Sequence, residues 1–372
     1  MPNKFISVKE IARQALPRLI ENLVFPNLVH QDYSDDFVKG KGATIQIKKP
    51  VILTANEFDS TKGTQPQDTE EESVDVTLDK LATVDVEYSA IESATSVDDI
   101  KRLFIEPAAV ALAEKINRDG LEVYRDIPSI VGKAGTTVST LNDLAGVRKV
   151  LNDQKVPLKG RKAVWDSAAD ANLITIPAIV NAEKSGSTEA LREGSLGRVM
   201  SLDNYMSQAV KNHVKGTLAS SGTTKIIIKA DVTEAEKVVL AASASGTLSG
   251  TVVKGDILTI NNKTYVVTTA AEASNNEIEV KVYPAISAKA NDIVTVLDSH
   301  TANLAFNPSA FAFVTRPLNA PSGVECYVTS YNGITLRVVR GYDMKYKKDM
   351  LSMDVLYGYK TVYPEMATRV LG

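Results

Sequence analysis

The sequence has 372 residues, enough for two or three structural units, and 44% of them are hydrophobic and 23% charged. This composition is ordinary for a folded globular protein and argues against a disordered chain, a collagen or a coiled-coil rod. The single cysteine, Cys326, excludes a disulfide scaffold, and three histidines are too few for a His-rich metal centre. A formal net charge of −3 lacks the basic excess of conventional DNA-binding domains.

The first residues do not show an apolar signal core followed by a small-residue cleavage site. No run of 18 apolar residues occurs along the sequence, so we expect no membrane span. The default expectation is synthesis in the cytoplasm, where thiols stay reduced.

Residues 7–24 carry apolar side chains at helical spacing, and Ser7 and Glu10 have the spacing of a capping box. Pro17 lies in the middle of this stretch and is expected to bend or split the helix. A short terminal amphipathic helix has little of its own domain to pack against. We therefore predict an arm that docks on another molecule, and a first helix packed on its own core is the alternative.

Residues 34–88 predict a protruding two-stranded ribbon. Two strand patterns, 43–54 and 74–88, flank a polar stretch that is too long for a tight hairpin turn. The charges are segregated, because 35–49 contains four lysines and two acids whereas 57–79 contains eight acids and one lysine. An isolated ribbon is marginal in water, so we expect it to lie over a neighbouring subunit where opposite charges fix the register. Simple solvation of the charges is the alternative.

The ribbon also supplies the only site residues that we predict, which are contacts between subunits. They are chosen by their position on the two legs of the ribbon: Lys48 and Lys49 on the basic leg, and Glu70, Glu71 and Glu72 on the acidic leg.

The strongest helical pattern covers residues 97–126, where Pro107 is a suitable first helical residue. Apolar residues keep to one side over about 20 residues, which corresponds to about 30 Å of helix. The adjacent acids at 98–99, like those at 35–36, could bind a divalent cation. Adjacent acids at a helix start are more often caps, and we interpret them so.

Residues 139–213 alternate helix and strand patterns, which is typical of a small α/β unit. Ser139 precedes a helical pattern, 161–166 (RKAVWD) is a buried-strand pattern, and 168–173 is a short helix. Trp165 is most simply a core residue. The unit resumes after residue 302 with four further strand patterns, at 310–315, 325–330, 334–342 and 350–357.

Residues 214–302 differ in composition from the rest. The whole chain has 8 Phe, 1 Trp and 13 Tyr, yet this stretch contains only Tyr265 and Tyr283. Gly, Ser, Asn and Asp separate short Val/Ile/Thr runs at 225–229, 238–241, 256–260, 265–269, 277–282 and 293–297. Such spacing is typical of a small all-β domain, and Asn261–Asn262 between two runs indicates a hairpin. We predict an inserted β-barrel.

The sequence contains no motif for phosphate binding or for nucleophilic catalysis. A G-x-x-x-x-G-K-[ST] loop is absent, and the stretch 194–197 is not a nucleophile elbow. Cys326 lies in an apolar strand pattern with no histidine close in sequence, so we interpret it as a packing residue. We predict no enzyme, no catalytic residue, no cofactor and no metal.

Four segments in a fixed order carry a resemblance to a known family. Residues 107–122 look like a spine helix, 189–204 match a turn before an insertion, and 303–318 and 356–365 match segments after it. In this order they resemble the major capsid (coat) proteins of tailed double-stranded DNA bacteriophages, in particular the short-tailed phage coat proteins with an inserted β-barrel. The resemblance covers nearly the whole chain and rests on the order and spacing of these segments.

The resemblance implies an α+β, HK97-like phage capsid fold with an all-β barrel insertion domain. The matching division of the chain is an N-terminal arm at 1–33, an E-loop with flanking strands at 34–90, a P-domain with the spine helix at 91–138, the first part of the A-domain at 139–213, the inserted barrel at 214–302, the A-domain return at 303–340 and the C-terminal P-domain strands at 341–372.

The resemblance also implies a structural function, self-assembly into the icosahedral shell that encloses a phage double-stranded DNA genome. Implied partners are copies of this chain in hexamers and pentamers, a scaffolding protein, a portal and non-specifically packaged DNA, with no membrane. The protein would reside in the virion and assemble in the host bacterial cytoplasm. Two alternatives remain open: an encapsulin-like compartment shell, and a surface protein whose β-domain binds a glycan.

Overall fold

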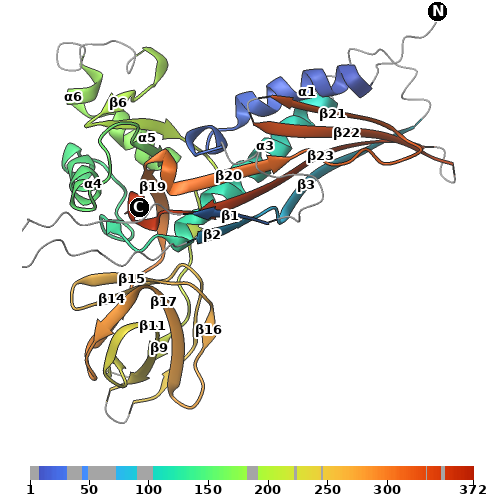
Figure 1. Ribbon diagram of the computed structural model, residues 1–372. Coiled ribbons are helices and arrows are strands. Elements are labelled where there is room, and N and C mark those ends of the chain that lie inside the picture. Colours follow the sequence, from blue (N-terminus) through green and yellow to red (C-terminus); the bar gives the residue numbers. More distant parts are fainter. Residues whose placement is uncertain are drawn as a thin grey trace, which may run out of the picture. The chain divides into compact units, whose positions relative to one another are not determined.

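The computed structural model describes residues 8–31, 44–48, 73–89, 104–181, 192–221, 224–243, 246–331, 333–344 and 348–372. The chain forms two compact units. Unit 1 comprises residues 1–18, 31–112 and 312–362, and unit 2 comprises 19–30, 113–311 and 363–372. Both units are therefore discontinuous in sequence, and Figure 1 follows the chain through them.

Unit 1 is built on a five-stranded sheet in which β21 pairs with β22, β22 with β23 and β23 with β3, all antiparallel. Alternate side chains of these strands, such as Val338, Met353 and Val355, are fully buried, as a sheet with one covered face requires. The strands are β3 (Lys80–Ser89), β20 (Phe311–Arg316), β21 (Glu325–Tyr331), β22 (Ile334–Asp343) and β23 (Lys348–Thr361). The four strand patterns predicted after residue 302 are confirmed as strands, but they form the sheet of unit 1 and do not continue the α/β unit as predicted.

The N-terminal helix α1 (Val8–Asn22) packs on its own chain. Val8 and Ala12 are almost fully buried, and the Val8 amide donates a hydrogen bond of 3.4 Å to Glu325 of β21, 317 residues away. The prediction that this helix docks on another molecule is therefore wrong, because its apolar side chains are already buried within the single chain. The helix also continues through Pro17 without a break, so it is not split. Ser7 lies outside the described residues.

The ribbon is described at its base, where β1 (Thr44–Lys48) pairs antiparallel with β2 (Ser73–Thr77). The predicted strand at 74–88 is interrupted at residues 78–79, so β2 and β3 are separate strands. The prediction of two antiparallel legs is confirmed for these paired residues, and the polar stretch between the legs lies outside the described part of the chain.

Unit 2 contains a seven-stranded sheet in the order β4-β24-β19-β5-β7-β6, with β8 also paired to β19. Its strands are β4 (Ile130–Val131), β5 (Lys162–Trp165), β6 (Arg198–Val199), β7 (Leu202–Met206), β8 (Asn212–His213), β19 (His300–Phe306) and β24 (Ala367–Leu371). The helices of this α/β part are α4 (Leu141–Asp153), α5 (Ser167–Ile174) and α6 (Pro177–Val180), with short 3-10 turns η1 (Pro26–Leu28), η6 (Pro308–Ala310) and η7 (Pro364–Met366).

The core of this α/β part is centred on Trp165, which is fully buried as predicted. Its indole Nε1 donates to Asn204 of β7 over 2.9 Å, so the one polar group of the ring is satisfied. Helix α4 begins at Leu141, the first residue of the predicted helical pattern, and Thr140 is its N-cap and forms a capping box with Asp143.

The predicted spine helix is α3 (Glu106–Leu121), followed by the 3-10 turn η5 (Glu122–Asp126). Pro107 is its second residue, while residues 97–103 and the acid pairs at 35–36 and 98–99 lie outside the described residues. Asn117 of α3 accepts hydrogen bonds from the amides of Val24 and Phe25 and is itself 6% exposed. This contact fixes the chain as it leaves α1.

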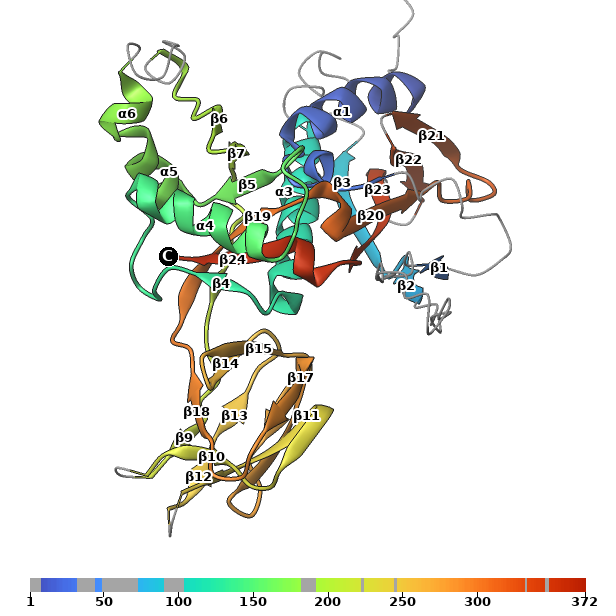
Figure 2. The same ribbon diagram turned by 60° about the vertical axis from the view of Figure 1, so that its left-hand side comes forward.

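The insertion is a closed six-stranded barrel, as predicted, with the order β10-β11-β17-β15-β14-β18 (Figure 2). Asn261 and Asn262 have positive φ values of 49° and 62°, which form the tight hairpin between β14 and β15. The barrel strands are β10 (Ile226–Ile228), β11 (Val232–Ala242), β14 (Ile257–Ile260), β15 (Lys263–Val267), β17 (Glu277–Ala288) and β18 (Ile293–Val296). Two short pairs flank them, β9 (Ala219–Ser220) with β12 (Leu248–Ser249) and β13 (Thr251–Val252) with β16 (Ala271–Glu272).

Candidate assembly surfaces

The structure describes one of the five predicted contact residues. Lys48 is the last residue of β1, and its backbone pairs with Ser73 of β2. Lys49, Glu70, Glu71 and Glu72 lie outside the described residues. Lys48 therefore stands where the described base of the ribbon ends.

The base of the ribbon is fixed to the sheet of unit 1 by a close backbone approach. Ile47 and Val76 are buried there, so the two legs share an apolar side. A Cβ atom at Gly358 of β23 would lie 2.1 Å from the carbonyl oxygen of Thr77, a distance that real side chains do not reach. Only glycine allows β2 to pack so closely on β23.

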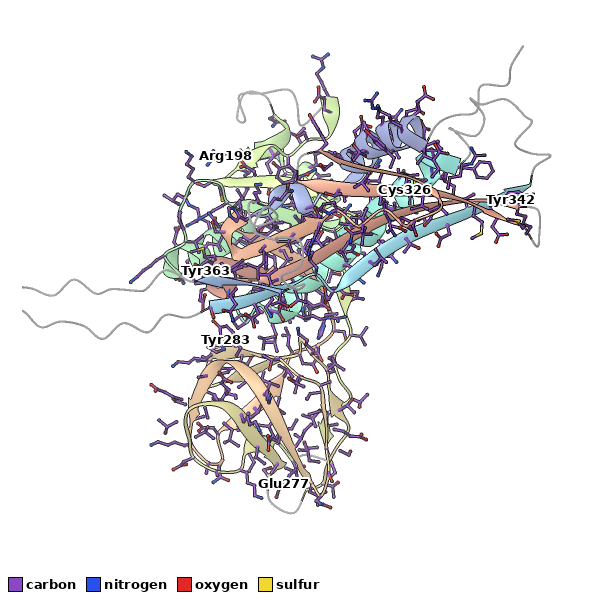
Figure 3. The ribbon with its side chains drawn as sticks, turned by 45° about the vertical axis from the view of Figure 1, so that its right-hand side comes forward. Arg198, Glu277, Tyr283, Cys326, Tyr342 and Tyr363 are labelled. Atoms are coloured by element: carbon purple, nitrogen blue, oxygen red, sulfur yellow. The ribbon has the colours of Figure 1, made fainter. Side chains whose placement is uncertain are left out.

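The sheet of unit 1 exposes large apolar side chains near the β22–β23 hairpin. Tyr342 is 52% exposed and Met344 79% exposed, and Figure 3 shows Tyr342 at the end of the strand. Val324, Tyr342 and Met350 line a shallow cleft of about 290 Å³, which we call the tip cleft. These exposed apolar side chains are available for contact with another protein.

Cys326 lies in β21, as the sequence pattern predicted, and is partly buried. Burial raises the pKa of its thiol, which keeps the sulfur protonated and weakly nucleophilic. The residue is consistent with packing and offers no reactive centre.

Unit 2 contains a buried polar cluster where the barrel meets the α/β part, and we call it the seam. The Tyr124 hydroxyl lies 3.0 Å from Nδ1 of His213, whose Nε2 donates to Asp256 over 2.9 Å. The Asp256 carboxylate also accepts the amides of Val253 and Gly216, at 2.8 and 3.1 Å. Every acceptor position of this carboxylate therefore faces a donor.

The arrangement resembles an acid–histidine relay, but its burial prevents catalysis. Tyr124, His213 and Asp256 are each at most 4% exposed, so no substrate can reach the imidazole. No serine, threonine or cysteine side chain stands at the free end of the histidine, where a nucleophile would be needed; the tyrosine occupies that position. The seam is a structural network.

Arg369 of β24 is the cation of the seam and is fully buried. Its Nη1 donates to the carbonyl of Gly255 over 2.9 Å, and its Nη2 donates to the carbonyls of Tyr124 and Ile127. The guanidinium also lies over the Tyr124 ring, 5.0 Å from the ring centroid. Burial lowers the pKa of Arg369 to about 10, so it stays charged at neutral pH.

His300 of β19 completes the seam. Its Nδ1 donates to the carbonyl of Asp298 over 2.8 Å, and its Nε2 lies 3.5 Å from Nη1 of Arg369. Burial, reinforced by the charge of Arg369, lowers the pKa of His300 to about 4. The ring is therefore neutral at pH 7 and can accept a weak hydrogen bond from the arginine.

A larger open cleft of about 680 Å³ lies in unit 2 between the barrel and the α/β part. Tyr265 and Tyr283 from the barrel and Gln154 and Glu365 from the α/β part line it, and the Tyr283 hydroxyl hydrogen-bonds to Glu365. Among the described residues, no group of three or more His, Cys, Asp or Glu side chains could hold a metal ion. The helices within the described ranges include none long and apolar enough to cross a membrane.

A comparison with protein families gives a match over residues 142–372, more than half of the chain, to the P22 coat protein (gene protein 5). The chain belongs to the P22 coat protein family. It is therefore a structural major capsid protein of the tailed-phage type. No curated protein matches the chain.

The solved structures similar to this coat protein include phage capsids. The structure of Mycobacterium phage Che8 aligns with a TM-score of 0.55 at 16% identity, over 94% of this chain and 90% of the other. The capsid structure of the cyanophage P-SCSP1u aligns with a TM-score of 0.51 at 12% identity, over 94% and 88%. The coat protein thus has the HK97-like fold, α+β with an inserted barrel, as the sequence resemblance implied.

The seam of the coat protein could not be predicted from the sequence. One signal was present, because His213 and His300, two of the three histidines, stand at the two ends of the predicted insertion. Tyr124 and Arg369 gave no sequence signal of their contact, since they lie 245 residues apart in the chain.

Proposed function

We propose that this coat protein assembles with copies of itself into hexamers and pentamers of an icosahedral shell, and that its role is structural and not enzymatic. The observation that carries the proposal is membership of the P22 coat protein family across residues 142–372. A phage coat protein of this fold acts as a repeated building block, so its partners are first of all identical chains.

The surface of unit 1 supports this proposal. The tip cleft presents apolar side chains, such as Tyr342 and Met350, that the described part of the chain leaves exposed. Small apolar contacts of this size form individually weak interfaces, which allow wrongly placed subunits to dissociate during assembly.

The ribbon is proposed to act as an E-loop that lies over an adjacent subunit. In this arrangement Lys48 and Lys49 would face acids of the neighbour, and Glu70, Glu71 and Glu72 would face its basic groups. The segregation of lysines and acids between the two legs supports this pairing. The division of the chain into arm, E-loop, P-domain, A-domain and insertion given above belongs to the same proposal.

Further partners follow from the assembly of a phage head in the host bacterial cytoplasm. We propose a scaffolding protein and a portal as assembly partners, and packaged DNA as a non-specific one. The formal net charge of −3 supports weak contact with DNA, because a strongly basic inner surface would hold the genome during packaging and ejection.

Negative-stain electron microscopy of the purified, expressed chain, with and without a scaffolding partner, tests the proposal. We expect closed shells or hexameric and pentameric tiles. A chain that sediments as a monomer under all conditions would contradict it. A co-purifying enzyme cargo inside shells would favour the encapsulin-like alternative, and specific glycan binding by the barrel would favour the second alternative; the comparisons favour neither.

Reversal of the three acids on the ribbon, E70K/E71K/E72K, tests the proposed contacts. We expect shell yield to fall at least tenfold while the circular dichroism spectrum and melting temperature of the monomer stay unchanged, because the proposal assigns these charges to contacts between subunits and not to the folding of the single chain. The matched control changes the net charge equally on the barrel, at Glu234, Glu236 and Glu272. Normal shells from the ribbon variant would refute the assigned contacts.

A further inference from the structure

The seam is assembled from two parts of unit 2 that contribute opposite charges. The α/β part supplies the cation Arg369 together with His213, His300 and Tyr124, and the barrel supplies Asp256 and the carbonyl of Gly255. Asp256 of the barrel binds His213 of the α/β part, and Arg369 binds the barrel carbonyl of Gly255 in addition to the carbonyls of Tyr124 and Ile127 in its own part. Because an unpaired buried charge is strongly unfavourable, the barrel and the α/β part hold each other in place through this cluster.

His300 is the seam residue whose protonation would place a second positive charge beside Arg369. Its Nδ1 is occupied by the Asp298 carbonyl, so an added proton must go to Nε2, which faces Arg369. The result would be two cations separated by 3.5 Å, with a further imidazole, His213, only 5.3 Å away between ring centroids.

Arg369 from β24 and His213 from β8 face His300 and disfavour its protonation. Asp256 of the barrel favours protonation, but its effect is smaller than theirs. Asp256 is the only acid among these groups, and His213 and the amides of Gly216 and Val253 already hold its carboxylate. It could turn toward a charged His300 only by giving up those bonds.

We propose that the seam is an acid-sensitive latch, in which protonation of His300 releases the barrel from the α/β part while both parts keep their strands. The closed hydrogen-bond ladder of the barrel and its own apolar core allow it to persist after release. The seven-stranded sheet has a separate core around Trp165. The rim ion pair between Lys254 and Asp126, 2.8 Å long, remains as a looser tether.

The direction of the pH effect follows from the two states of His300. In the latched state its pKa is about 4, whereas in the released state the ring is hydrated and regains the ordinary value of 6.5. The latch is therefore fully stable above pH 6.5 and weakens as the pH falls toward 4. Between pH 7.5 and 4.5 this difference lowers the latching equilibrium constant about 70-fold.

Hydrogen exchange of the full-length, unassembled chain at pH 7.5 and 4.5, corrected for intrinsic exchange rates, tests the latch. We expect peptides that contain Gly216 and Val253, whose amides bind the Asp256 carboxylate that release exposes to water, to lose protection about 70-fold at pH 4.5, while those of β17 keep theirs. His300→Asn retains a donor in place of Nδ1 but cannot be protonated, so it should abolish the acid response. The matched control His30→Asn, outside the seam, should respond as the wild type does.

A measurement on the wild-type chain does not depend on any variant folding. Imidazole NMR signals of the three histidines, followed from pH 8 to 4, should place the titration of His300 in the same pH range as the loss of protection. The latch is overturned if His300→Asn keeps the acid response, or if seam and β17 amides lose protection together. It is also overturned if His300 titrates near pH 6.5 with no change in exchange.

Discussion

The barrel of unit 2 and the five-stranded sheet of unit 1 are both antiparallel, but they differ in whether strand edges remain open in a single chain. The barrel closes on itself, so no strand of β10-β11-β17-β15-β14-β18 is left with an open edge. The sheet of unit 1 ends in β3 and β21 and exposes Tyr331 and Tyr342. The barrel is thus stable as a single copy, whereas the sheet keeps surface and edges that other chains can use.

The largest effect that we predict comes from opening a hole in the barrel core. Leu240→Ala removes a side chain that is fully buried between β10 and β17, and core truncations of this kind lower the free energy of unfolding by about 2–5 kcal/mol. Urea unfolding of the unassembled chain measures it. The control Ile293→Ala, at a residue 46% exposed on β18, should change stability by less than about 1 kcal/mol. Equal losses would contradict the closed-core interpretation.

The second effect is a local clash in unit 1. Gly358→Ala would place a methyl group 2.1 Å from the Thr77 carbonyl oxygen, whereas the same change at Gly341, on the neighbouring strand β22, meets nothing within 4 Å. Overpacking of this kind costs about 1–3 kcal/mol. We expect Gly358→Ala to lower the melting temperature and to expose the base of the ribbon to protease, and Gly341→Ala to leave both unchanged. Indistinguishable variants would show that β2 is not held on β23.

Substitutions in the tip cleft should have the smallest effect on folding. We expect them to reduce assembly instead. Tyr342→Ser and Met350→Ser replace exposed apolar side chains, so the free energy of unfolding should change by at most about 0.5 kcal/mol. Sedimentation should nevertheless show fewer assembled particles than the control Leu158→Ser, which alters an equally exposed residue of unit 2. Full assembly of both tip variants would leave the cleft without a role between subunits.

Elements whose signals are local could be predicted from the sequence. The barrel strands follow Val/Ile runs separated by turn residues, and the positive φ angles of Asn261 and Asn262 explain why those residues separate β14 from β15. Helix α4 follows its capping box at Thr140. In each case residues within one turn or one strand decide the structure.

Features that depend on distant partners could not be predicted. The packing of α1 on its own chain could not be predicted, because Glu325 of β21, which accepts the hydrogen bond of the Val8 amide, lies 317 residues further along the chain. The seam was missed for the same reason, since Asp256 finds His213 only after the barrel has closed and docked. A periodic apolar pattern shows that a helix face is buried, but it does not show by what.

The pairing of β8 with β19 has a consequence for how such chains evolve. His213 and His300 are register partners on adjacent antiparallel strands, so the chain leaves the sheet and re-enters it at neighbouring positions. In the topology of the sheet, the whole barrel therefore takes the place of the loop that would join β8 and β19 as a hairpin. A gene could shorten, exchange or lose this module without changing the order of the remaining strands, provided that Arg369 and Tyr124 were replaced by residues suited to a bare surface.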